Sequence, residues 1–92
     1  MKKCFELIIE GRVQGVGFRY FACNNALKYN INGYVRNMPD GNVEIVCSGE
    51  EQDLDKFISK MKKGPSFSYI SSFKINELIS NDYNFNSFEI KY

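Results

Sequence analysis

The segment of the chain best suited to chemistry is a glycine-bearing loop that leads directly into a helical pattern. It runs from residue 11 to residue 19 and reads GRVQGVGFR. Gly15 and Gly17 let the backbone curl so that its N–H groups converge, and the helix start adds unpaired N–H groups and a positive dipole end. Arg19, in the first helical turn, presents a planar guanidinium suited to phosphate oxygens. Together these features describe a compact oxyanion site made of the loop amides, the helix start and Arg19.

This glycine pattern matches neither of the common nucleotide-binding loops. The chain lacks the GxxxxGK[ST] sequence of a Walker A loop, and Tyr20 stands where the dinucleotide fingerprint needs glycine or alanine. A G-x-G sequence before a helix is also compatible with a tight turn that carries a surface arginine. The glycine spacing alone leaves both interpretations open.

A second candidate is Asn37, which ends a predicted strand just before a turn. Its side-chain amide can donate and accept hydrogen bonds, so it could hold a water in line with a phosphoryl group bound at the loop. Asparagine is also common beside turns, so its position is equally compatible with a purely structural role.

Alternating strands and two helices must position these residues. Apolar and polar residues alternate over 4–13, 31–38, 43–49, 70–79 and 88–92, most weakly over 70–79. Apolar residues recur at helical spacing from Phe18 to Tyr29 and from Leu54 to Met61. This order predicts an α+β fold: a ferredoxin-like split βαβ sandwich, with a mostly antiparallel five-stranded sheet and two helices on one face.

Local signals mark the boundaries of several of these elements. The turn sequence at 39–42, PDGN, joins 31–38 and 43–49 into a hairpin. Ser48 and Glu51 have the S-x-x-E spacing of a capping box for the second helix. Gly64 and Pro65 end that helix.

The composition predicts one domain over residues 1–92 and excludes several classes of protein. The chain has no His, which rules out imidazole bases, His-containing triads and His metal ligands. Its 12 basic and 11 acidic residues leave a net charge of +1, too weak for many phosphate contacts, so we expect no nucleic-acid partner. The carboxylates are dispersed, and we expect neither a metal nor a cofactor.

The cysteines and the N-terminal segment point to a reducing, aqueous environment. Cys4, Cys23 and Cys47 form no CxxC pair and have apolar neighbours, so we expect small buried or half-buried hydrophobes rather than nucleophiles. Glu6 and Glu10 interrupt the first apolar stretch before it is long enough for a signal peptide or a membrane span. We expect a cytoplasmic monomer that does not contact membranes.

Two stretches of the sequence carry a resemblance to a known family. Residues 9–19, which fit the pattern IxGxVQGVxFR, resemble the first signature of the acylphosphatase family, and residues 33–49, with GYVRNxxxGxV and a closing glycine, resemble the second. The resemblance covers essentially the whole chain. Tyr34 is a departure, since many relatives have tryptophan there.

The resemblance implies hydrolysis of the carboxyl–phosphate bond of acyl phosphates, which gives a carboxylate and inorganic phosphate. It implies that Arg19 and the amides from Gly15 to Phe18 bind the phosphoryl group and that Asn37 orients the attacking water. This chemistry suits a chain without His, because the good leaving group lets positioning and charge stabilisation replace a strong base.

Two other functions remain open from the sequence. Aromatic side chains such as Phe18 and Tyr34 on a ferredoxin-like sheet could stack single-stranded RNA, although no RNP1-like run is present. Acylphosphatase-like domains also occur within larger carbamoyl-transfer proteins that use carbamoyl phosphate. Those proteins are much longer, so we expect the free-standing hydrolase.

Overall fold

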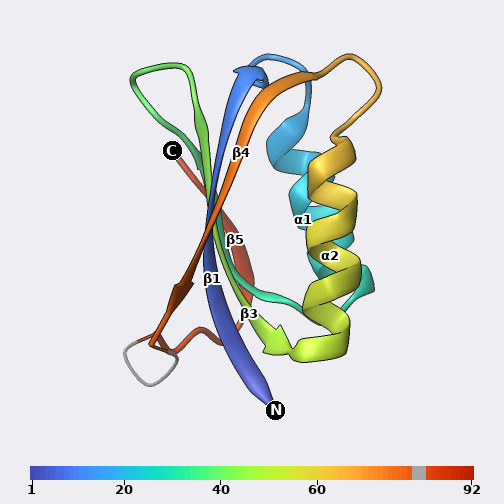
Figure 1. The fold of residues 1–92 in the computed structure, drawn as a ribbon, viewed down its shortest axis with the longest axis vertical. Coiled ribbons are helices and arrows are strands. Elements are labelled where there is room, and N and C mark those ends of the chain that lie inside the picture. The colour runs from blue at the N-terminus through green and yellow to red at the C-terminus, as the bar shows by residue number, and fades with distance from the viewer. Residues whose placement is uncertain (80–82) are drawn as a thin grey trace.

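Two helices cover one face of a five-stranded sheet, as the sequence predicts (Figure 1). The computed structural model describes residues 1–79 and 83–92. In chain order the elements are β1 (Lys2–Arg12), α1 (Phe18–Lys28), β2 (Asn32–Asn37), β3 (Val43–Glu50), α2 (Glu51–Lys63), β4 (Tyr69–Leu78) and β5 (Phe88–Lys91). The predicted α+β, ferredoxin-like plan is confirmed.

The order of strands in the sheet brings the two predicted signatures together. The order is β4-β1-β3-β2-β5, and only the β2–β5 pair is parallel. Because β1 and β2 both lie antiparallel to β3 between them, they run in the same direction. Ile9 and Asn37 both pair with Val43, at the start of β3. The loop that follows β1 therefore emerges at the end of the sheet where β2 reaches Asn37.

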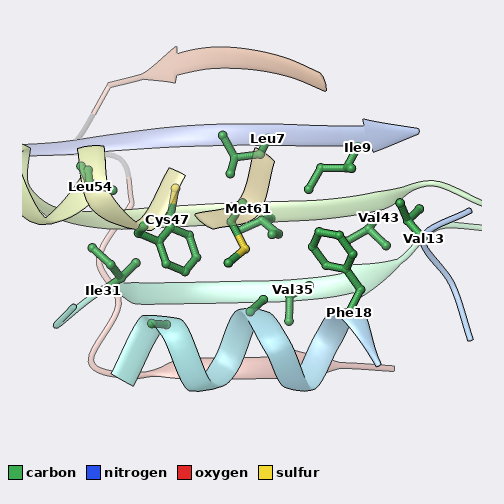
Figure 2. Close-up of a cluster of buried hydrophobic side chains, with 14 residues drawn as sticks. Leu7, Ile9, Val13, Phe18, Ile31, Val35, Val43, Cys47, Leu54 and Met61 are labelled. Atoms are coloured by element: carbon green, nitrogen blue, oxygen red, sulfur yellow. The ribbon is translucent and has the colours of Figure 1, made fainter. Parts of the chain in front are cut away.

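The core lies between the sheet and the helices and is filled mainly by strands and α2. The α2 side chains that it buries are Leu54, Phe57 and Met61, whereas α1 contributes Phe18 and two alanines. Each large buried side chain stabilises the fold by about 1.5–3 kcal/mol relative to exposure. Figure 2 shows Phe18 pointing from α1 toward the sheet beside Val13 and Val43. This contact anchors the first turn of α1 next to the loop.

The predicted capping box of α2 is wrong. β3 continues to Glu50, and Ser48 pairs with Cys4 on one side and Asn32 on the other. The N-cap residue is Glu50, and its side chain makes no capping hydrogen bond. Hydrogen bonding of β3 with the strands on both sides keeps Ser48 in the strand, so the local S-x-x-E sequence does not form a capping box. The predicted end of α2 is confirmed, since Gly64 is its C-cap residue.

Neither described helix has the length and apolar character needed to cross a bilayer.

Candidate active site

The loop between β1 and α1 has an unusual backbone at its two glycines. Gly15 has φ +73° and Gly17 has φ +80°, values in the left-handed region that favour glycine. Gly17 is the N-cap of α1, and its carbonyl accepts the first helical hydrogen bond from the Phe21 N–H at 3.0 Å. No side chain of the described residues caps the helix, and its first turn holds no acidic residue. The N–H groups of that turn are therefore available to an anion.

A small cavity joins this loop to the end of β2. It measures about 170 Å³ and is lined by Val13, Gly15, Gly17, Phe18, Arg19, Tyr20 and Asn37. The residues predicted from the loop thus meet Asn37, which lies 18 positions beyond Arg19 in the chain. Val16 does not line the cavity, because its half-buried side chain packs against the core. The cavity contains one cationic side chain and one amide side chain, an arrangement that can hold an oxyanion and a water.

Gln14 ties the loop to the turn between β2 and β3. Its Nε2 donates one hydrogen bond of 2.8 Å to the carbonyl oxygen of Met38 and another of 2.8 Å to that of Asn42. These bonds fix the glycines of the loop relative to Asn37, one residue before Met38. The sequence alone predicts no role for Gln14. The only sign of its contacts in the sequence is a polar side chain between Val13, which is buried, and the loop glycine Gly15.

Arg19 carries a charge that no described carboxylate neutralises through an ion pair. Its guanidinium carbon lies 4.8 Å from the centroid of the Tyr92 ring, a cation–π contact that restrains the side chain without cancelling its charge. The helix start and the Arg19 guanidinium therefore give the cavity a positive potential.

Arg36 has the opposite environment. Its Nε lies 2.6 Å from Oε1 of Glu44, a buried residue on the face of the sheet away from the helices. Burial disfavours the charged form of Glu44, yet the hydrogen bond and the charge of Arg36 lower the pKa of that carboxyl below that of a free glutamate. This ion pair holds Arg36 on the sheet, which agrees with an arginine that has no direct role in the chemistry of the cavity. The third arginine, Arg12, is exposed at the end of β1 and does not line the cavity.

The cysteines lie away from this chemistry. Cys4 and Cys47 are buried and Cys23 in α1 is half-buried, as predicted. Burial raises the pKa of all three thiols. Protonated thiols are poor nucleophiles, so the structure supports their prediction as hydrophobic side chains.

The two aromatic residues that suggested RNA stacking are not available for it. Phe18 is 2% exposed in the core. The Tyr34 ring is packed against Phe85, with centroids 6.0 Å apart, and lies under the Lys91 ammonium. Its hydroxyl donates a hydrogen bond of 3.3 Å to Glu44. Stacking of bases on either ring would require this packing to be undone.

Comparisons with known proteins agree with the geometry. Residues 5–90 match the family model described as acylphosphatase. Over 87 residues the chain is 44% identical to an acylphosphatase of Archaeoglobus fulgidus, with 95% of this chain and 96% of that protein covered. An acylphosphatase of Bacillus licheniformis is 43% identical over 88 residues, which cover 96% of this chain and 97% of the other.

Solved structures show the same similarity. The crystal structure of acylphosphatase from Bacillus subtilis matches with a TM-score of 0.92 and 39% identity, and the match covers 100% of both chains. The structure of full-length HypF in its phosphate- and nucleotide-bound form matches with a TM-score of 0.91 and 35% identity. In that case the match covers 100% of this chain but only 12% of the HypF chain.

Proposed function

The chain belongs to the acylphosphatase family and hydrolyses acyl phosphates, and we propose that the cavity between the 13–17 loop and β2 is where it does so. In this proposal Arg19 and the amides of Gly15, Val16, Gly17 and Phe18 bind the phosphoryl group, and Asn37 orients the attacking water. The observation that carries the proposal is the convergence of Gly15, Gly17, Arg19 and Asn37 on one cavity.

The loop amides and Arg19 act on the charge of the phosphoryl group. In a loose transition state this charge is spread over the three equatorial oxygens. Donors held in place before the reaction stabilise it without the cost of reorganising solvent. The left-handed glycines, the Gln14 hydrogen bonds and the Tyr92 contact of Arg19 all restrict movement of these donors.

Asn37 acts on the water. Its amide oxygen can accept a hydrogen bond from a water placed on the side of the phosphorus nearest the sheet. The water oxygen forms a bond to phosphorus while the bond from phosphorus to the acyl oxygen breaks. The carboxylate leaves with that electron pair, and both water protons remain on the phosphate as H₂PO₄⁻. No general base is required, which suits a cavity where no described residue contributes a carboxylate and a chain without His.

The same residues support a reaction that does not depend on a metal ion. Among the described residues, the polar side chains that line the cavity are the Arg19 guanidinium, the Asn37 amide and the Tyr20 phenol, none of them a carboxylate. Metal ions of the kind used with phosphates prefer carboxylate oxygens as their protein ligands. We therefore expect turnover to withstand chelation.

The test is phosphate release from benzoyl phosphate in the presence of EDTA. The wild type should turn over at the same rate with and without the chelator. Arg19→Ala should lose both turnover and binding of inorganic phosphate, whereas Asn37→Ala should lose turnover but still bind phosphate weakly, with binding measured by a direct phosphate titration. Arg12→Ala removes an arginine outside the cavity and serves as the control.

Near-native turnover by folded Arg19→Ala would show that the phosphoryl group is bound elsewhere. Loss of wild-type turnover in EDTA would refute the metal-independent mechanism.

A further inference from the structure

We infer that Tyr20 contacts the acyl group of the substrate, and that the enzyme therefore favours acyl phosphates whose acyl group is aromatic or otherwise bulky and apolar. Because the phosphoryl group must occupy the cavity for this contact to form, the inference rests on the proposed function.

Tyr20 lies at the mouth of the cavity rather than in the core. It is one of the cavity-lining residues, together with Arg19 and Asn37, and it is 68% exposed. The side of α1 that faces the sheet is marked by its buried residues Phe18, Ala22 and Ala26. Position 20 is half a helical turn from positions 18 and 22, so Tyr20 stands on the side of α1 away from the sheet.

The geometry of in-line displacement sends the acyl group toward that side. The attacking and leaving oxygens lie on opposite sides of the phosphorus. Asn37 belongs to β2, so a water that it holds attacks from the sheet. The acyl oxygen then departs away from the sheet, where Tyr20 is the exposed side chain of the cavity wall.

A tyrosine at this place has no evident role in holding phosphate. Its ring is large, apolar and uncovered, and its neighbours in the cavity already supply the donors that an oxyanion needs. An aromatic face can instead pack against another ring with a preference for offset or edge geometry.

A second exposed tyrosine lies beside the cavity, next to Arg19. Tyr92 is 94% exposed and lies against the Arg19 guanidinium. A bulky acyl group leaving the cavity therefore meets aromatic surface, while a methyl group is too short to use it.

The experiment compares kcat/KM for benzoyl phosphate with kcat/KM for acetyl phosphate. In Tyr20→Ala the ratio of the two values should fall about three- to tenfold, as expected for the loss of one aromatic pair. Tyr20→Phe keeps the ring and should keep the ratio. Leu27→Ala removes another exposed apolar side chain of α1, 83% exposed and outside the cavity, and should also keep it.

Inhibition by inorganic phosphate separates this inference from the proposed function. Phosphate has no acyl group, so its inhibition constant should be the same in Tyr20→Ala and in the wild type. An unchanged substrate ratio in Tyr20→Ala, or an equal loss on both substrates, would overturn the role of Tyr20 while leaving the cavity as the active site. Undiminished turnover of both substrates by Arg19→Ala would instead overturn the proposed function itself.

Discussion

The two helices pack on the same face of the sheet but differ in the charge of the residues at their N-termini. α2 begins with Glu51 and Asp53 in its first turn, and the Glu51 carboxylate is also 3.2 Å from the Lys3 ammonium. α1 follows an N-cap residue, Gly17, in a left-handed conformation, and its first turn has no acidic residue but contains Arg19.

If the proposed function is right, the difference separates a helix start that serves the fold, in α2, from one that serves the substrate, in α1. Carboxylates in the first turn complement the positive end of the helix dipole, so the charge at the N-terminus of α2 is balanced by acidic side chains of the helix itself. The first turn of α1 has no such carboxylate, which suits the anion site proposed there. A missing cap costs a helix about 0.5–2 kcal/mol, and the core side chains of α2 help to offset such a cost.

The largest expected effect comes from giving α1 the acidic first turn of α2. Arg19→Glu places a carboxylate where the phosphoryl group should bind, so kcat for benzoyl phosphate should fall about 10³–10⁵-fold, as for loss of an arginine that stabilises phosphoryl transfer. The melting temperature should not fall, because the new charge suits the helix dipole. Arg12→Glu makes the same charge change outside the cavity and should retain most activity. If both variants lose activity equally, net charge rather than the cavity controls turnover.

The next effect concerns the stability that α2 supplies. Phe57 is fully buried, so Phe57→Ala should lower the free energy of unfolding by about 3–5 kcal/mol, because it leaves a cavity in the core. Urea denaturation measures this loss. Lys56→Ala changes the neighbouring exposed side chain and should stay within about 0.5 kcal/mol of the wild type. A small loss for Phe57→Ala would mean that the core does not depend on α2.

A third effect tests whether the backbone of the loop is part of the site. Gly17 has φ +80° and open space where a side chain would begin, so Gly17→Ala costs strain without a clash. The strain should displace the amides, and a shift of about 1 Å can reduce turnover about 10²-fold. Gly41 has φ +94° and equally open surroundings, but it lies in the turn after β2 and outside the cavity.

Gly41→Ala is therefore the matched control for Gly17→Ala. The two variants should lose similar stability, measured by thermal unfolding, while only Gly17→Ala loses most of its turnover. Equal activity in the two would mean that the precise backbone of the loop is unimportant for catalysis.

The smallest effect belongs to the carboxylates of α2. Glu51→Gln and Asp53→Asn should each lower the free energy of unfolding by about 0.3–1 kcal/mol at low salt, and less as salt screens the dipole. Urea denaturation at two salt concentrations measures this change, with Asp55→Asn as a control beyond the first three helical residues. Turnover of benzoyl phosphate should not change. A loss of turnover would link the N-terminus of α2 to the active site and would contradict a purely structural role for that terminus.

The sequence predicts the fold well because its signals are periodic and agree with one another. Alternation in the strands and the apolar stripe of α2 indicate which faces are buried, and the glycines at 15 and 17 mark the loop before α1. Ser48 shows the limit of local signals, because pairing of β3 with strands distant in the sequence decides where the strand ends.

The site is less predictable where its contacts join distant parts of the chain. The carbonyl groups that accept from Gln14 lie 24 and 28 residues away, and their positions depend on the turn between β2 and β3. The contact between Arg19 and Tyr92 likewise requires β5 to lie beside β2. No spacing in the sequence carries this information, because it arises from the order of strands in the sheet.

The most direct test of the contrast between the two helices is a titration of the ¹⁵N-labelled protein with inorganic phosphate, followed by amide chemical shifts. The largest shifts should fall on the backbone amides of residues 15–19 and on the side-chain amide of Asn37, with little change at residues 51–53. Shifts centred on the start of α2, or none at residues 15–19 at saturating phosphate, would contradict the assignment of α1 as the anion-binding helix.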